Sequence, residues 1–180
     1  MDIAFDSSRR SFVATATATL VLAGFPIDSM AETKGLNTGG KQMTNLTPYI
    51  LFDGNCQEAM EFYKSCFGGE LTSLKVKDSP AKDHMPAIQQ EKTVNARLTS
   101  GKLDISASDW LRLDEPRVRG NTVCLYLSGG SLSELKVLFE RLSTVAEVTD
   151  PLKETFFGVY GALNDKFGVR WMFTAPKAGE

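Results

Sequence analysis

The hydrophobic pattern of residues 49–69 predicts a short strand followed by an amphipathic helix. The apolar run 49–53 precedes Asn55, and Asn55 with Glu58 has the spacing of a capping box, which predicts that the helix begins there. The glycine pair at 68–69 is typical of a helix end. Five apolar residues share one face of this helix at spacings of three and four, namely Cys56, Ala59, Met60, Tyr63 and Phe67.

Three strands are predicted after this helix. In residues 93–100 apolar side chains alternate with polar ones, which is the period-two pattern of a sheet with two different faces. Gly101 and Lys102 fit a tight hairpin connection to the next strand. The three predicted strands are Glu70–Val76, Thr93–Ser100 and Leu103–Ser108.

The same order of elements returns in the second half of the chain. Residues 123–127 alternate like a strand, Ser131 and Glu134 form a second capping box, and an apolar helical face follows as far as Leu142. Three further strands are predicted at Glu147–Thr149, Thr155–Leu163 and Val169–Thr174.

Two strand–helix–strand–strand–strand modules, at about 44–109 and 120–177, predict a single α+β domain over residues 44–177. One module alone leaves a face of its sheet uncovered. Two modules side by side can curl their sheets around a shared cleft and keep the helices outside. The alternative architecture is a ferredoxin-like sandwich, which also combines two helices with antiparallel strands.

The first 43 residues differ in character from this domain. Arg9 and Arg10 precede a weakly apolar stretch and a small-residue site near Ala31, which is the order of a twin-arginine export signal over residues 1–31. Residues 32–43 are predicted to be a flexible linker. We therefore expect a periplasmic or exported protein with no membrane segment in its mature form. If translation starts at Met43, the protein is cytoplasmic instead.

Composition and charge exclude some classes of function and of fold. The 180 residues have a net charge of −2 and 42% hydrophobic residues, which fits a globular domain and gives no reason to expect nucleic acid as a partner. Three cysteines do not make a disulfide framework, and Cys124 is expected to be a small buried apolar residue. The densest charged stretch, residues 112–119, mixes both signs and is predicted to be a solvated connector.

Two stretches of the sequence together resemble the PhnB-like branch of the vicinal oxygen chelate superfamily, which includes glyoxalases, bleomycin-resistance proteins and extradiol dioxygenases. The resemblance covers nearly all of residues 44–175. It implies the paired-module fold (the glyoxalase/bleomycin-resistance fold), a homodimer, and a ligand cleft inside each cupped sheet. The stretches that carry it are Thr47–Cys56, Ala59–Lys64 and Phe67–Gly69 in the first half, and Pro151–Gly158 and Asp165–Met172 in the second.

Enzymes of this superfamily bind a divalent metal through His and Glu side chains on the cleft face. The matching positions here are Pro48, Asn95, Asn121 or Thr122, and Met172, and none of them is a usual ligand. The resemblance therefore implies a protein without this metal site, and no cofactor is expected. The alternative is a displaced divalent-metal site.

Such a displaced site would use Glu154, Asp104 and His84, the single histidine of the chain, in a lyase or dioxygenase-type enzyme. His84 lies in the loop 78–86, where a solvent-exposed histidine is the simpler interpretation. The sequence has no glycine-rich phosphate loop or nucleotide fingerprint, so the methyltransferase activity attributed to this branch is not expected.

The candidate ligand-binding residues are polar or amphipathic side chains that the strand alternation places on or near the proposed cleft face. They would orient a polar organic ligand through hydrogen bonds and a charge pair; alternatively, they are structural ion pairs and a satisfied tyrosine hydroxyl. The five candidates are Asn95, Arg97, Tyr126, Glu154 and Arg170.

The leading hypothesis is a metal-independent protein that binds or sequesters a small organic molecule, with catalysis undecided. The first alternative is the metal-dependent enzyme. The second is a structural or interaction protein with a vestigial cleft.

Overall fold

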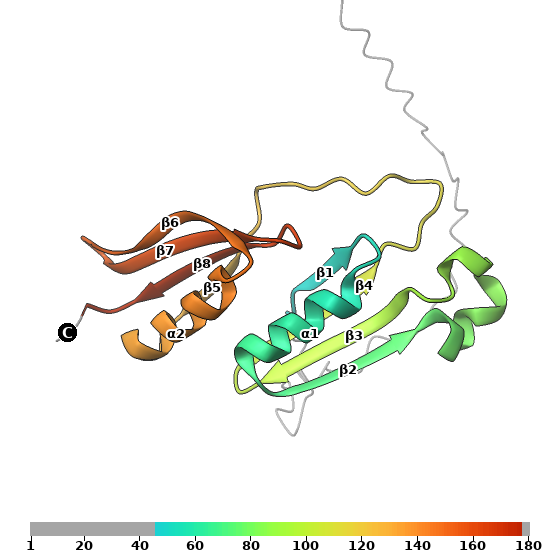
Figure 1. Cartoon of the computed structure of the whole chain (residues 1–180), viewed down its shortest axis with the longest axis horizontal. Helices are drawn as coiled ribbons and strands as arrows, with labels where there is room; N and C mark the ends of the chain where they lie inside the picture. Colours follow the sequence, from blue (N-terminus) through green and yellow to red (C-terminus); the bar gives the residue numbers. More distant parts are fainter. Residues whose placement is uncertain (1–45, 178–180) are drawn as a thin grey trace, which may run out of the picture. The chain divides into compact units, whose positions relative to one another are not determined.

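The computed structural model describes residues 46–177, which belong to one compact unit spanning 44–180 (Figure 1). The predicted export signal (1–31) and linker (32–43) lie outside the described residues. No helix within 46–177 has the length and apolar character needed to cross a membrane. The elements are β1 (Tyr49–Phe52), α1 (Cys56–Phe67), β2 (Glu70–Lys75), three short 3₁₀ turns η1 (Val76–Asp78), η2 (Pro80–His84) and η3 (Ala87–Gln89), β3 (Thr93–Ser100), β4 (Leu103–Asp109), β5 (Leu125–Ser128), α2 (Leu132–Ser143), β6 (Ala146–Thr155), β7 (Gly158–Asp165) and β8 (Arg170–Ala175).

The strands form two four-stranded mixed sheets with the same topology. The first has the order β1-β4-β3-β2 and the second the order β5-β8-β7-β6. In each module the first and last strands are parallel neighbours, and the other pairs are antiparallel. This architecture confirms the predicted α+β fold of paired modules.

Each helix covers one face of its own sheet and leaves the other face open. In β3, Ala96 and Leu98 are buried against α1, while Asn95 and Arg97 are exposed on the opposite face. The predicted alternation is therefore confirmed. Four of the five residues expected on the apolar face of α1 are fully buried, namely Cys56, Ala59, Met60 and Tyr63. The fifth, Phe67, is partly buried against the same core.

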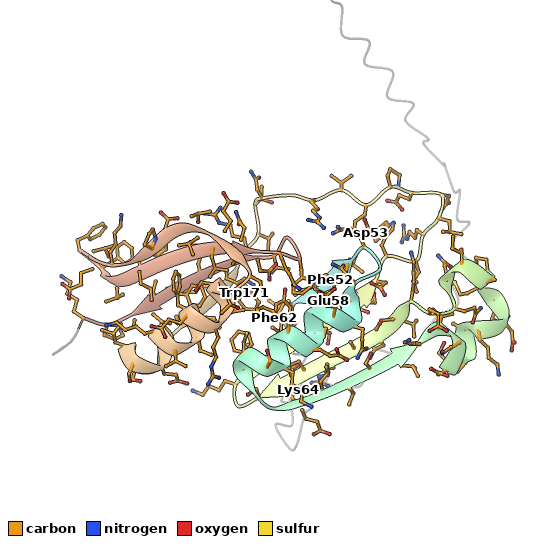
Figure 2. The ribbon with its side chains drawn as sticks, viewed as in Figure 1. Phe52, Asp53, Glu58, Phe62, Lys64 and Trp171 are labelled. Carbon is orange, nitrogen blue, oxygen red and sulfur yellow. The ribbon has the colours of Figure 1, made fainter. Side chains whose placement is uncertain are left out.

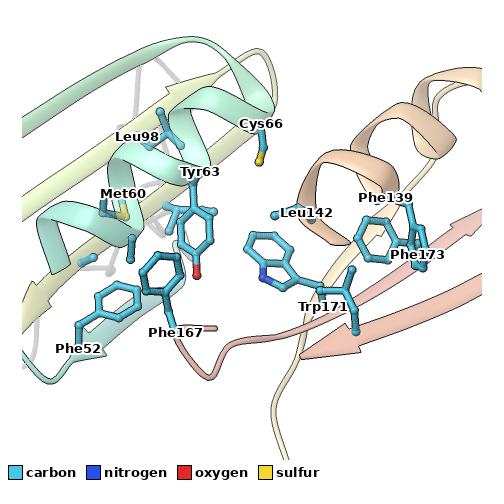
Figure 3. Packing of buried hydrophobic residues seen from close by; sticks show 14 of the residues in the cluster. Phe52, Met60, Tyr63, Cys66, Leu98, Phe139, Leu142, Phe167, Trp171 and Phe173 are labelled. Carbon is cyan, nitrogen blue, oxygen red and sulfur yellow. The ribbon is translucent and has the colours of Figure 1, made fainter. Parts of the chain in front are cut away.

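A cluster of aromatic rings joins the two modules (Figure 3). The ring of Tyr63 on α1 meets Trp171 of β8 edge-on, with ring centroids 5.3 Å apart. Phe167, in the turn between β7 and β8, packs against Tyr63 and Phe52. Figure 2 shows Trp171 of the second module beside α1 of the first. Because Trp171 is fully buried, the modules share one core.

The predicted capping box at Asn55 and Glu58 is wrong. The Asn55 side chain makes no capping hydrogen bond, and its Oδ1 is buried without a partner. The N–H of Cys56 instead donates to Asp109 Oδ1 at 2.9 Å, and Asp109 Oδ2 accepts from Thr93 N at 2.8 Å. A carboxylate from the end of β4 therefore caps α1, because tertiary folding brings it closer than the local side chain. The second predicted cap is confirmed, since Ser131 Oγ accepts from Glu134 N at 3.2 Å.

The predicted strand Thr155–Leu163 is confirmed from Gly158 onward, but its start is wrong. β6 extends through Thr155, the chain reverses at Phe156 and Phe157, and β7 begins at Gly158. Gly158 has φ 130°, and a Cβ there would lie 2.5 Å from the carbonyl oxygen of Ala175. The reversal therefore depends on this glycine and on its close approach to β8. Phe156 and Phe157 are not residues typical of turns, so the sequence did not predict a reversal there.

Candidate ligand-binding groove

A groove of about 540 Å³, the β1–β5 groove, lies between the edge strands of the two sheets, β1 and β5. A smaller hollow of about 320 Å³ shares Pro48 and Leu125 with it and is lined also by Asp104 and Tyr126. Volumes of this size are typical of sites for small organic molecules. The groove is lined by Pro48, Tyr49, Ile50, Leu51, Gly120, Asn121, Val123, Cys124, Leu125, Asn164, Gly168, Val169 and Arg170.

Strand register explains why polar side chains reach this groove. Asn164 of β7 pairs directly with Arg170 of β8, so both side chains lie on the same face of the second sheet. Leu163 and Trp171, one position further on each strand, are buried on the other face. The alternation that buries Trp171 therefore places the half-buried Arg170 at the groove.

Two of the five candidate residues lie at this end of the molecule. Arg170 lines the β1–β5 groove, and Tyr126 lines the adjoining hollow. The Tyr126 hydroxyl forms a hydrogen bond of 2.5 Å with Thr174 Oγ1, so it is already oriented by the protein. Tyr126 is paired with Met172, which places it on the same sheet face as Arg170.

Asn95 and Arg97 lie on the open face of the first sheet and line neither of these two hollows. The Arg97 guanidinium donates two hydrogen bonds to the Asp104 carboxylate, at 2.9 and 2.6 Å. This pairing raises the pKa of Arg97 and lowers the pKa of Asp104. The Arg97 charge is therefore already matched within the protein.

Glu154 is not brought together with the other candidates. It pairs with Val159, which is buried on the helix side of the second sheet. Direct pairing places Glu154 on that same side, and its side chain is exposed there. The predicted strands, 147–149 and 155–163, left Glu154 between them, whereas β6 runs through it as far as Thr155 and fixes the face on which it lies.

The positions that match the superfamily's metal ligands do not form a donor set suited to a divalent metal. Pro48 has no donor side chain, Met172 offers only a thioether, and Asn95 lies on the first sheet. Nowhere in residues 46–177 do three His, Cys, Asp or Glu side chains gather as a metal site needs. The displaced set is also dispersed, because Glu154 lies on β6, Asp104 pairs with Arg97, and His84 is an exposed residue of η2.

The cysteines differ in their surroundings. Cys124 is half-buried rather than buried as expected, lines the groove, and its thiol lies 3.0 Å from the Met172 thioether sulfur. Cys56 is fully buried in the core, and burial together with the nearby Asp109 carboxylate raises its pKa to about 12. Cys56 is therefore held as a thiol, which is a poor nucleophile.

Two arginines of the connector between the modules reach this region, which the sequence patterns did not predict. Arg117 Nη1 donates to the carbonyl oxygen of Leu51 at 3.1 Å. A Cβ added to Gly168 would come within 2.3 Å of Arg119 Nη1, so the Arg119 guanidinium lies against this glycine. Because Leu51 and Gly168 both line the groove, these arginines lie at its rim. In a stretch of mixed charge, spacing alone does not single them out.

Residues 44–174 match the family described as 3-demethylubiquinone-9 3-methyltransferase. The chain belongs to this PhnB-like family. Among solved structures, protein PA1353 from Pseudomonas aeruginosa is 33% identical with a TM-score of 0.67, and the match covers 75% of this chain and 99% of that one. Protein YjdN from Escherichia coli is 28% identical over 142 residues, which is 73% of this chain and 95% of YjdN.

More distant structures place this PhnB-like protein in a wider fold group. A PhnB protein from Bacillus cereus is 22% identical, with a TM-score of 0.58 and coverage of 73% of this chain and 99% of that one. A glyoxylase/bleomycin resistance protein/dioxygenase domain from Frankia is 18% identical, with a TM-score of 0.53 and coverage of 77% and 96%. These two similarities establish the glyoxalase/bleomycin-resistance fold, as the resemblance implied.

Proposed function

We propose that this PhnB-like protein binds a small organic molecule in the β1–β5 groove, without a metal ion, and holds or sequesters it there. The observation that carries this proposal is the groove itself, which has about 540 Å³ of space and combines apolar walls with the polar side chains of Asn164 and Arg170. Small-molecule sites have this combination, since apolar surface provides most of the affinity and a few polar groups fix the orientation.

The donor chemistry around the groove supports a role without a metal. His, Cys, Asp and Glu are the residues that commonly ligate metals, and among the residues lining the groove Cys124 is the one of these types. Its neighbour Met172 offers a thioether, which is not suited to the hard divalent ions of lyases and dioxygenases. Arg170 and Tyr126 are the predicted ligand-binding residues that this site would use. Asn95 and Arg97 would enter only for a ligand that extends over the first sheet.

The test combines metal analysis with a ligand screen on the full chain, purified without an affinity tag or chelator. We expect metal far below one equivalent, an unfolding midpoint that does not change on adding a chelator, and at least one compound that raises the midpoint. Ligand binding to the folded state alone stabilises it by mass action. Near-stoichiometric zinc, nickel, iron or manganese would refute the metal-free part of the proposal.

A matched pair of variants locates the site. Val123 is 78% exposed and lines the groove, whereas Ile88 is 76% exposed in η3 and does not. Val123→Trp should fill the groove and abolish the ligand-induced shift, and Ile88→Trp should leave the shift unchanged. If the two variants affect the shift equally, the groove is not the binding site. The same conclusion follows if no compound stabilises the protein.

A further inference from the structure

Three arginines lie in the β1–β5 groove or at its rim. Arg170 lines it from β8, Arg117 donates to the Leu51 carbonyl on β1, and the Arg119 guanidinium lies against Gly168 in the turn before β8. They come from separate parts of the chain, and only tertiary folding brings them together. A guanidinium presents a planar fork of N–H donors that matches the geometry of a carboxylate.

Within residues 46–177, none of these three arginines forms an ion pair with an acidic side chain. The buried carboxylate in this region, Asp165, is already saturated, because its oxygens accept hydrogen bonds from Tyr63, Trp171 and the backbone N–H groups of Phe167 and Val169. By contrast, Arg97 and Arg112 are each paired with a carboxylate. These donors are neutral and leave the Asp165 charge in place, so three arginines beside one carboxylate give the groove a surplus of positive charge on a chain whose net charge is −2.

The rest of the groove wall is apolar. The apolar residues Ile50, Leu51, Val123 and Val169 line it, together with Tyr49. A small inorganic anion would leave this surface uncovered, and a neutral apolar molecule would leave the half-buried Arg170 without a partner. Only a molecule that carries an anionic group on an apolar body both pairs with Arg170 and covers the apolar wall.

We propose that the ligand of this groove is an organic carboxylate, with its carboxylate at Arg170 and an aromatic or aliphatic body against Tyr49 and Leu51. This assignment rests on the proposed function and names the ligand class of the same site. Arg117 and Arg119, at the rim, raise the local positive potential and favour entry of the anion. Asn164, paired with Arg170 in the sheet, offers an amide beside the same carboxylate.

The experiment compares two probes of nearly equal shape, 1-naphthoate and its neutral amide 1-naphthamide, by calorimetric titration of the full chain. We expect the carboxylate to bind about tenfold or more tightly than the amide, since charge-assisted hydrogen bonds provide the difference. Its binding should weaken as salt screens the arginines. Equal binding of the two probes would overturn the charge assignment while leaving the groove as a ligand site. Binding of neither probe up to about 10 mM would count against the groove itself.

Variants connect the effect to one residue. Arg170→Gln should remove most of the preference for the carboxylate, and Arg170→Lys, which keeps the charge but loses the fork, should retain part of it. Arg112→Gln is the matched control, because Arg112 is exposed and already paired with Glu115. If Arg112→Gln weakens naphthoate binding as much as Arg170→Gln, or if both Arg170 variants bind naphthoate like the wild type, the assignment of Arg170 is wrong.

Discussion

The hydroxyl of Tyr63 donates a hydrogen bond of 2.6 Å to Asp165 Oδ2, across 102 positions of sequence. Tyr63 lies on α1 of the first module and Asp165 at the end of β7 in the second. The same carboxylate oxygen accepts from Trp171 Nε1 at 2.9 Å, and its partner oxygen accepts from Phe167 N and Val169 N. One buried carboxylate therefore joins the helix of one module to the last hairpin of the other.

Removing this connection should destabilise the protein strongly. Asp165→Asn places amide N–H groups where four donors converge, and we expect a loss of about 2–4 kcal/mol in the free energy of unfolding. Tyr63→Phe removes one hydrogen bond and should cost about 1–2 kcal/mol. Urea denaturation measures both. The control is Lys166→Ala, whose exposed pair with Glu58 should contribute less than about 1 kcal/mol. Equal effects at Asp165 and Lys166 would contradict this interpretation.

The cap of α1 gives a second prediction. Asp109→Ala removes the acceptor of two buried N–H groups, those of Cys56 and Thr93, and should cost about 2–4 kcal/mol of folding free energy. Asn55→Ala should be close to neutral, because its buried Oδ1 has no partner to lose. Chemical denaturation of the two variants decides the matter. A larger loss of folding free energy for Asn55→Ala than for Asp109→Ala would support the local capping box instead.

Two adjacent glycines after α1 should respond differently to alanine. Both have positive φ, 71° for Gly68 and 85° for Gly69, so each substitution should cost about 1–2 kcal/mol from backbone strain alone. A Cβ on Gly69 would also lie 2.1 Å from the carbonyl oxygen of Thr99, whereas a Cβ on Gly68 has nothing within 4 Å. We expect Gly69→Ala to be worse by a further ~1–3 kcal/mol. Comparable unfolding midpoints for the two variants would show that β3 moves away freely.

Alkaline pH should destabilise the fold. Burial raises the pKa of Cys56 from its ordinary value of 9.0 to about 12, and burial with the Asp165 carboxylate raises the pKa of Tyr63 above 10.0. Above pH 9 the unfolded chain therefore loses protons that the folded chain keeps, so the free energy of unfolding falls as pH rises from 9 to 12. The slope is about 1.4 kcal/mol per pH unit for each group that titrates fully. In a series of urea titrations, Cys56→Ala should reduce this slope; an unchanged slope would exclude the cysteine contribution.

Local patterns in the sequence were sufficient for much of the fold. The spacing of Met60 and Tyr63 predicted the buried face of α1, and the alternation around Leu98 predicted which side of β3 faces it. Both follow from the fixed geometry of helices and strands, which depends on neighbouring residues only. The candidate site was predicted in part, since Arg170 and Tyr126 line the two hollows and Glu154 faces the other side of its sheet.

By itself, then, the sequence determined the two modules, their order and the residues that form most of the core. Only the tertiary structure decided that Asp109 caps α1, that Asp165 joins the modules, and that Arg117 and Arg119 come to the same groove as Arg170. These contacts depend on how distant segments pack, and an acidic or basic residue has the same local pattern whether it is solvated or paired across the fold. Periodicity shows which face of an element is buried, whereas the partner on that face is set by the packing of the whole domain.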